Sequence, residues 1–238
     1  MAHMENMMIN NTAHITGIVA TEFEFSHQVY GEGFYTCLVE VPRLSAANDL
    51  LPITISERLA DMDLLTVGSR VGISGQIRSY NSYSEDVKRT KLMLTIFARE
   101  VEIFEEGEPA SDDAGFDYFS ERTRYERPGR NVNEIFLNGY ICKQPIYRTT
   151  PFGREISDLL VAVNRSYNKS DYIPCIAWGR NARFAGKLCV SDNIRLWGRM
   201  QSRIYQKRLE NGEVEERTAY EISVSKIETA SKYPEEEL

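Results

Sequence analysis

The fold class that the sequence predicts is all-β, with two tandem copies of one small five-stranded barrel. At 238 residues the chain has room for two domains of roughly 100 residues, each able to bury its own core. Runs of β-branched and aromatic residues bounded by Pro and Gly recur in both halves, as expected for short strands. Matched residues recur at one interval, with a single residue of slip before the last pair: Gly17 and Gly139, Val41 and Val163, Pro52 and Pro174, Ala60 and Ala182, Gly75 and Gly198.

The second copy, residues 134–229, is predicted to hold five strands and one short helix. The helix is expected over residues 181–188, where Phe184, Ala185 and Leu188 fall on one side. A charged hairpin loop around Asn211 and Gly212 separates the last two strands. The strands are expected at residues 135–142, 156–164, 172–178, 194–204 and 217–227.

The first copy, residues 12–104, follows the same order, with a helix expected near residues 57–65. Five strands with a helix between the third and the fourth is the order of an OB-fold, a barrel whose face and loops bind oligonucleotides or oligosaccharides. The sequence therefore predicts two tandem OB-folds. In the first copy the strands are expected at residues 14–21, 34–42, 51–56, 70–80 and 91–104.

Three further segments complete the chain. Residues 1–11 combine a disordered N-terminus with a Met-Ala-His-Met start that looks like a tag remnant. Residues 105–133 form an acidic linker, interpreted as solvated, with the alternative that it imitates DNA or docks on a basic groove of a partner. Residues 230–238 form a short acidic tail.

Composition excludes several classes of protein. The four cysteines have neither CxxC nor Cys/His metal spacing, which favours reduced, mostly buried thiols and no metal or cofactor. Apolar runs are too short for a membrane helix, so we expect a cytoplasmic protein. Neither a nucleophile with its base nor a phosphate-binding glycine loop is recognisable, so the sequence does not predict an enzyme.

Charge is distributed unevenly along the chain. The formal net charge is −7, which by itself argues against a nucleic-acid partner. Yet residues 134–229 carry 15 Lys and Arg against 11 Asp and Glu, whereas residues 12–104 carry 8 against 12. The second copy is therefore basic, and this asymmetry bears on partners more than the total charge does.

The second copy holds a series of ordered sequence blocks along almost its whole length. They are Asn138-Gly139, LVAVNR at 160–165, YIPCIAWG at 172–179 with Ala182, IRLWGR at 194–199, RIY at 203–205, Gly212 and YEISV at 220–224. With these blocks the second copy resembles the bacterial single-stranded DNA-binding protein family. The first copy is a degenerate version that keeps Gly17, Val41, Arg43, Ala60 and Gly75 of the pattern.

The resemblance implies sequence-tolerant binding of single-stranded DNA in bacterial or phage replication, recombination or repair, and particles of four OB-folds, which a homodimer would supply here. It also implies that four aromatics stack on bases: Tyr167, Tyr172, Trp178 and Tyr205. The first copy has Ser45, Leu50, Ser56 and Ser82 at those places, so the rings are not needed by the fold. Nearby cations suited to phosphates are Arg165, Arg183, Lys187, Arg199, Arg203 and Lys207.

Some residues leave alternatives open. Trp197 either packs against a neighbouring domain or touches DNA, and Tyr80 and Tyr83 give the first copy a possible auxiliary contact beside a structural or assembly role. The acidic tail suggests recruitment of replication or repair proteins, although it lacks the family's terminal aromatic. The competing function is an OB-fold assembly module that binds a replication protein and contacts DNA only weakly.

Overall fold

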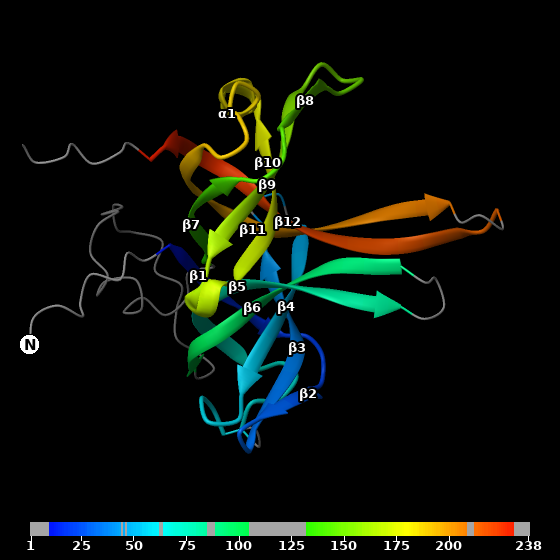
Figure 1. Cartoon of the computed structure of the whole chain (residues 1–238). Helices are drawn as coiled ribbons and strands as arrows, with labels where there is room; N and C mark the ends of the chain where they lie inside the picture. The colour runs from blue at the N-terminus through cyan, green and yellow to red at the C-terminus, as the bar shows by residue number, and fades with distance from the viewer. Residues whose placement is uncertain are drawn as a thin grey trace, which may run out of the picture. The chain divides into compact units, whose positions relative to one another are not determined.

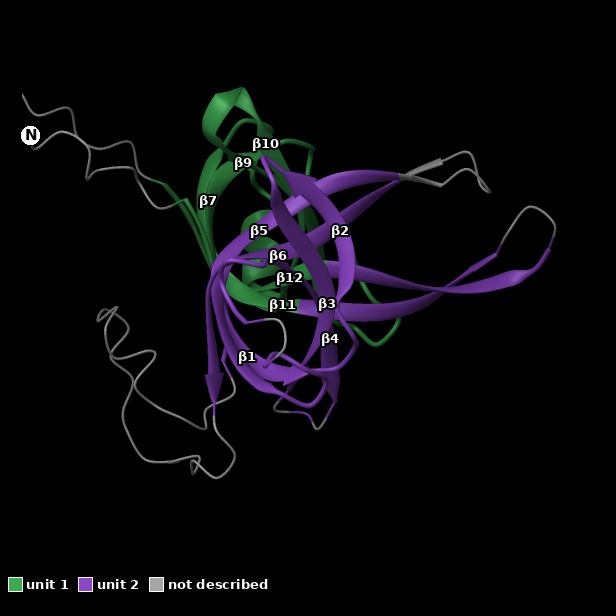
Figure 2. Ribbon diagram, turned by 90° about the horizontal axis from the view of Figure 1, so that it is seen from below, with its two compact units in different colours: residues 1–12, 135–200, 221–238 green, residues 13–134, 201–220 purple. Residues whose placement is uncertain are grey.

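The computed structural model describes residues 10–43, 45, 47–61, 64–84, 89–104, 132–208 and 212–230, and of residues 83, 84, 89 and 90 only the backbone. Residues 1–9, most of the acidic linker and residues 231–238, with the expectations made for them, lie outside this part. The chain divides into two compact units (Figure 2). Unit 1 comprises residues 1–12, 135–200 and 221–238, and unit 2 comprises residues 13–134 and 201–220.

The second repeat forms a closed barrel. Its sheet runs in the order β7-β11-β12-β10-β9-β8, and β9 returns to pair with β7. β10 and β12 are parallel, whereas β9 is antiparallel to β7, β8 and β10, and β11 is antiparallel to β7. Its elements are β7 (Asn133–Ile141), β8 (Ile146–Thr149), β9 (Glu155–Asn164), the 3-10 turn η1 (Ser166–Asn168), β10 (Ser170–Trp178), α1 (Gly179–Ala185), β11 (Asn193–Arg208) and β12 (Val214–Thr229).

The first repeat closes in the same way. Its sheet runs β2-β3-β4-β6-β5-β1, with β3 returning to β1 and β4 parallel to β6. This equivalence confirms the predicted all-β class. The strands are β1 (Asn11–Val19), β2 (Glu24–Val29), β3 (Glu32–Pro42), β4 (Asn48–Ser56), β5 (Arg70–Ser84) and β6 (Arg89–Phe104).

The helix expected over residues 57–65 is wrong: the described residues of this stretch form turns. The N–H of Leu59 donates to the carbonyl of Ser56 at 3.0 Å, the three-residue spacing of a turn rather than the four-residue spacing of an α-helix. The hydroxyl of Ser56 accepts the N–H of Arg58, and the Glu57 carboxylate turns back to accept the N–H of Gly33 at 2.9 Å. The helix predicted in the second repeat is present as α1, shifted towards the N-terminus.

Each barrel also has a sixth short strand that the sequence did not predict. All six residues of β2 and all four of β8 are exposed, so neither strand shows the apolar alternation that reveals a half-buried strand. Each pairs with the strand that follows it, β2 with β3 and β8 with β9, and so forms a hairpin.

The matched glycines are explained by close approach between strands. A Cβ on Gly139 would lie 2.5 Å from the carbonyl oxygen of Ala162. Gly17 would meet the carbonyl of Glu40 in the corresponding way, and Gly75 and Gly198 would each meet a carbonyl of the facing strand. Only a residue without a side chain fits where the strands pass so closely, which accounts for this part of the repeat register.

Two long hairpins extend the strands beyond the barrels, one formed by β5 and β6 and the other by β11 and β12 (Figure 1). Residues 201–220 of the second hairpin, which we call the arm, belong to unit 2. The arm is therefore packed with the first repeat although it is drawn from the sequence of the second.

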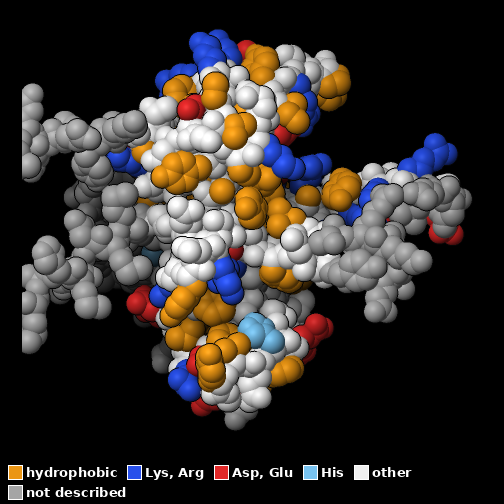
Figure 3. Space-filling model, viewed as in Figure 1, with side chains coloured by type: hydrophobic (Ala, Val, Ile, Leu, Met, Phe, Trp, Pro, Cys, Tyr) orange, Lys and Arg blue, Asp and Glu red, His pale blue; other side chains and the backbone are white. Residues whose placement is uncertain are grey.

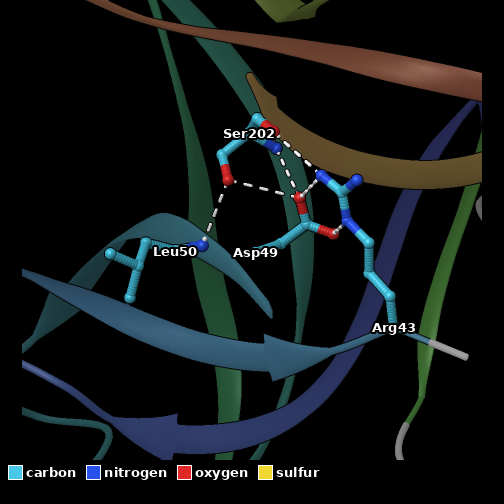
Figure 4. A network of polar contacts seen from close by, with 4 residues as sticks. All are labelled: Arg43, Asp49, Leu50 and Ser202. Atoms are coloured by element: carbon cyan, nitrogen blue, oxygen red, sulfur yellow. Dashed lines mark hydrogen bonds and ion pairs between the residues drawn. The ribbon is translucent and has the colours of Figure 1, made fainter. Parts of the chain in front are cut away.

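A buried polar cluster fastens the arm to the first repeat (Figure 4). Asp49, whose side chain is 1% exposed, forms a bidentate pair with Arg43, with N–O distances of 2.7 and 2.5 Å. The same carboxylate accepts the backbone N–H of Ser202 at 2.7 Å, while Arg43 donates to the Ser202 carbonyl at 2.9 Å. The backbone of the arm thus completes the hydrogen bonding of a buried ion pair.

Candidate nucleic-acid interface

β10 carries two of the predicted rings on one face. Tyr172 is 47% exposed and Trp178 is 39% exposed, whereas the alternate residues Ile173, Cys175 and Ala177 are buried. β10 pairs with β9 along its whole length and with β12 on its other side, so both rings stand on a strand held from two directions. The arrangement provides two aromatic faces at a fixed spacing on a rigid support.

Tyr167 projects from the turn between β9 and β10. It lies in η1 with a left-handed φ of 61°, and its side chain is 95% exposed. The N–H of Arg165 donates to the carbonyl of Lys169 at 2.7 Å and closes the loop at its base. Tyr167 gains almost nothing from burial there, so packing does not explain a large ring at this position.

Arg165 is paired with a buried carboxylate. Its Nη1 lies 3.4 Å from Oδ1 of Asp171, whose side chain is fully buried. Arg43 and Asp49 form the matching pair in the first repeat, at the same place between two strands. Because this pair is present in both repeats, its plainest role is to close the hairpin. The charge of Arg165 is therefore partly compensated within the protein.

Other cations lie over α1 and β8, where Lys and Arg side chains gather on the surface of unit 1 (Figure 3). Arg183 lies 3.2 Å from Glu155, and Arg148 lies 2.9 Å from Asp158, so each already has an acidic partner. The O–H of Tyr147 donates to Glu155 at 2.6 Å, and this hydrogen bond raises the pKa of Tyr147. Lys187 is exposed just beyond α1.

Trp197 is half-buried on β11 and contacts residues of unit 1 on neighbouring strands. Its ring lies 5.1 Å from that of Phe136, its cross-strand partner on β7. The Lys226 ammonium lies 4.3 Å from the ring centroid, a cation–π distance. Both contacts are within the barrel, so Trp197 has packing partners without any bound ligand.

The arm carries the fourth predicted ring. Tyr205 is half-buried, and the guanidinium of Arg203 lies 5.6 Å from its ring centroid. Lys207 lies two residues further on and is also half-buried. Hydrogen bonding from Arg217 lowers the pKa of Glu215, and Lys207 and Lys91 lower it further. The arm therefore alternates acidic and basic groups around an aromatic ring.

Tyr80 stands on β5 with 51% of its side chain exposed. On the arm, burial raises the pKa of Tyr220, and the charge of Tyr80 raises it further. Arg199 is half-buried on β11. The side chain of Tyr83 lies outside the described part of the chain.

The corresponding face of the first repeat is different. Leu50 stands at the place of Tyr172 and is 41% exposed, and Ser56 stands at the place of Trp178 and is 5% exposed. Between them the hydroxyls of Thr54 and Thr95 are hydrogen-bonded at 2.8 Å. Leu50, Thr54 and Ser56 thus occupy the face of β4 that corresponds to the aromatic face of β10, and none of them has a ring.

Two almost fully exposed aromatic side chains were not among the predicted site residues. Tyr30 is 102% exposed and Phe152 is 92% exposed, at the tips of the β2–β3 and β8–β9 hairpins. Each is followed by a glycine, and the two lie at the interval that separates Gly17 from Gly139. That coincidence is a signal in the sequence, although the hairpins themselves were not predicted.

Other site chemistry is limited in the part of the chain that the structure describes. Those residues contain neither a group of three or more His, Cys, Asp or Glu placed to hold a metal ion nor a helix long and apolar enough to cross a membrane. All four cysteines are free, and burial raises the pKa of Cys37 to about 12.

Comparison with known proteins places these features in context. The model of the single-strand binding protein family matches residues 132–230. Single-stranded DNA-binding protein B of Bacillus subtilis (strain 168) is 30% identical over 81 residues, which are 31% of this chain and 72% of that protein. Single-stranded DNA-binding protein 1 of Staphylococcus aureus (strain COL) is 31% identical over 84 residues, 32% of this chain and 50% of that protein. The chain spans about half the length of the first curated relatives it matches.

Similarity to solved structures covers both repeats of the chain. The wild-type single-stranded DNA binding protein from Thermus aquaticus matches with a TM-score of 0.66 at 17% sequence identity, covering 94% of this chain and 94% of that one. At this identity the match shows the fold alone, and it covers the whole tandem arrangement. The N-terminal domain of PriB from Thermoanaerobacter tencongensis is 50% identical over 40% of this chain, with a TM-score of 0.35.

Proposed function

Because the chain belongs to the single-strand binding protein family, we propose that it binds single-stranded DNA without sequence preference and protects it during replication, recombination or repair. The observation that carries the proposal is the pair of exposed rings, Tyr172 and Trp178, on one face of β10. Every base has a flat face, so stacking on such rings tolerates any sequence, and each stacked base contributes roughly 1–3 kcal/mol.

Tyr167 and Tyr205 are the further stacking residues of this proposal. Tyr167 is almost fully exposed without a packing role. On the arm, the guanidinium of Arg203 lies over the ring of Tyr205. Tyr80 supplies an auxiliary contact from the first repeat, in which β4 lacks rings at the matched positions. Binding therefore rests mainly on the second repeat.

Phosphate contacts fall to the cations around these rings. Lys187 is exposed, Arg203 is exposed on the arm, and Arg183 can exchange its surface carboxylate partner for a phosphate at little cost, because exposed ion pairs are weak. Neutralising phosphates releases counterions, so affinity falls as salt rises. Arg199 and Lys207 complete the set, and Arg165 contributes only the part of its charge that Asp171 leaves uncompensated.

The proposed role is binding rather than catalysis, in the cytoplasm of a bacterium or of a phage-infected cell, where single-stranded intermediates arise. We propose a homodimer as the working form. The support is that one chain supplies two OB-folds and the resemblance implies four per particle. Light scattering coupled to gel filtration tests this, since a dimer has twice the chain mass of 27.3 kDa.

Tryptophan fluorescence during titration with oligo-dT of roughly 35 nucleotides, long enough for two OB-folds, tests the proposal directly. The chain has two tryptophans, so a Trp197→Phe variant leaves Trp178 as the only reporter. We expect strong quenching by the single strand, weaker quenching at high salt, and little response to duplex DNA of the same length.

A folded protein that gives no quenching and no binding at low salt would overturn the proposal. Binding of a replication protein that survives Trp178→Ala, with no detectable DNA affinity, would instead establish the assembly module that competes with it. A circular dichroism spectrum of each variant shows whether its fold is intact.

A further inference from the structure

The tips of two matched hairpins carry aromatic side chains that are almost fully exposed. Tyr30 joins β2 to β3 and Phe152 joins β8 to β9, and their exposed fractions of 102% and 92% leave both rings entirely in solvent. They occupy equivalent positions in the two repeats, followed in each case by a glycine with a left-handed φ, 83° for Gly31 and 75° for Gly153.

The β8–β9 tip is an ordered turn. The N–H of Gly153 donates to the carbonyl of Thr150 at 2.9 Å, which closes a four-residue turn with Pro151 and Phe152 at its centre. The N–H groups of Thr150 and Arg154 are also bonded across the base of the turn, at 2.8 and 3.0 Å. Phe152 is therefore presented by a fixed backbone.

The β2–β3 tip reaches the same result by a different route. Val29 pairs with Glu32, so only Tyr30 and Gly31 form the turn, and both have positive φ, 50° and 83°. Such turns strongly prefer Asn-Gly, and a bulky residue at the first position is strained. A bulge at Ser26, between the Phe25 and His27 pairs, shifts the register by one residue, and the aromatic still falls at the apex.

Packing does not account for these rings. A fully exposed ring gains no burial energy, and Tyr30 adds backbone strain. The two repeats differ at four other matched aromatic positions and use different turns here, yet both keep a ring at the tip. A single exposed apolar side chain needs no explanation, but the same placement reached through two backbone geometries indicates a shared use.

We propose that Phe152 and Tyr30 each stack on a base of bound single-stranded DNA, so that the first OB-fold takes part in binding through its hairpin tip. The inference rests on the proposed function, and it gives the first repeat a contact that its β4 face cannot provide. Loops that follow the first long strand of an OB-fold are among the parts of this barrel that contact nucleic acid.

The charges beside both tips are compatible with a phosphate backbone. Arg154 follows the Phe152 turn and is exposed, and Arg148 lies on the opposite strand of the hairpin. Beside Tyr30, the Glu32 carboxylate is held by the hydroxyl of Ser56 and by Arg58 at 3.4 Å. Its charge is thus engaged towards β4, and Arg58, with 69% of its side chain exposed, supplies a cation.

Alanine and conservative substitutions test both tips in the full-length chain. Phe152→Ala and Tyr30→Ala should each weaken oligo-dT binding at least about fivefold, the lower end of one stacked base, whereas Phe152→Tyr and Tyr30→Phe should bind like the wild type. Val190→Ala in unit 1 and Leu64→Ala in unit 2 are matched controls, since these side chains are exposed, 50% and 67%, but have no ring.

Photocrosslinking reports contact itself. Oligonucleotides carrying 5-iodouracil should crosslink to the peptides that contain Phe152 and Tyr30, and these crosslinks should disappear in the alanine variants. If both alanine variants bind like the wild type while Trp178→Ala binds weakly, the tip contacts are refuted and the proposed function stands. If the wild type does not bind, the proposed function fails. Loss at Phe152 alone would overturn the role of the first repeat.

Discussion

The carboxylate of Asp49 in β4 accepts the backbone N–H of Ser202 in β11 at 2.7 Å, so a strand of the second repeat completes the coordination of a buried ion pair in the first. A side chain hydroxyl strengthens the same junction, because Ser202 Oγ also lies 3.2 Å from Asp49 and 3.3 Å from the N–H of Leu50. This cluster links the arm to the first repeat and contains none of the proposed stacking residues.

Replacing Asp49 by Ala should lower the free energy of unfolding by about 3 kcal/mol or more, because Arg43 and the Ser202 N–H lose their buried partner. Urea denaturation measures the change. Asp158→Ala, which breaks an exposed pair with Arg148, is the control and should cost under about 1 kcal/mol. Equal effects of the two variants would contradict a stabilising role of the buried Asp49 cluster.

Trp178→Ala and Tyr172→Ala should each weaken single-strand binding by roughly 1–3 kcal/mol while leaving the thermal midpoint nearly unchanged, since both rings are substantially exposed. Tyr140→Ala is a matched control, because Tyr140 is 44% exposed on β7. Fluorescence anisotropy of a labelled oligonucleotide measures the affinity. Unaltered binding by both variants would remove β10 as the site.

Replacing Arg165 should mainly change the stability of the fold, whereas replacing Lys187 should mainly change how the DNA affinity depends on salt. Arg165→Ala takes a partner from buried Asp171 and should lower the free energy of unfolding by about 1 kcal/mol. Lys187→Ala should leave stability within about 0.5 kcal/mol but reduce the slope of log affinity against log salt by about 0.7, the value for one phosphate contact on a single strand. A salt titration of each variant distinguishes the two; the reverse pattern would exchange their roles.

Thiol reactivity should follow burial. Cys189 is exposed and should react with a thiol reagent at pH 8, whereas Cys37 and Cys175 should react only on unfolding. Burial raises the pKa of Cys37 from its usual 9.0 to about 12, and burial also raises the pKa of Cys175. Below pH 9 both thiols are protonated in the folded and in the unfolded chain, so neither lowers the free energy of unfolding there.

Above pH 9 the unfolded chain loses thiol protons that the folded chain retains. The free energy of unfolding should consequently fall, by about 1.4 kcal/mol per pH unit for each such thiol, up to pH 12 for Cys37. Urea denaturation at several pH values in this range measures the loss, and a Cys37→Ala variant should show a shallower decline. Equal slopes for the variant and the wild type would contradict the assignment.

Gly139→Ala should be severely destabilising, by about 2 kcal/mol or more, because the new methyl group would meet the carbonyl oxygen of Ala162 at 2.5 Å and the strands would have to separate. Gly68→Ala is the control: open space surrounds Gly68, and only its φ of 93° opposes the substitution, at about 1 kcal/mol. Denaturation midpoints of the two variants decide the comparison.

Much of this fold could be predicted from the sequence because its most regular residues follow from the geometry of paired strands. Gly17, Gly139 and Gly198 recur where strands approach too closely for a side chain, and the alternation from Tyr172 to Trp178 follows from the strand period. The helix predicted near Glu57 is wrong, because the chain turns after Ser56 and the Glu57 carboxylate accepts the N–H of Gly33 on β3. This contact depends on where Gly33 lies in space, which the local sequence does not record.

The candidate site was predictable to a similar extent. Tyr172 and Trp178 fall on the expected face, whereas the engagement of Arg165 by Asp171 and of Arg183 by Glu155 depends on pairing that spacing alone does not reveal. Phe152 and Tyr30 were missed because β2 and β8 are wholly exposed and lack an apolar pattern. Both rings nevertheless lie at the interval that separates the two repeats, so a comparison of matched positions could have found them.

The arm has a consequence for how this protein is made. Unit 2 includes residues 201–220, so its last segment leaves the ribosome only after residues 135–200 of unit 1. A domain normally folds as soon as its own sequence has emerged, whereas buried Asp49 of the first barrel gains its Ser202 partner only after most of the second repeat has been synthesised. A gene cut between the repeats would therefore leave the first barrel without Ser202, the backbone partner of its buried Arg43–Asp49 pair.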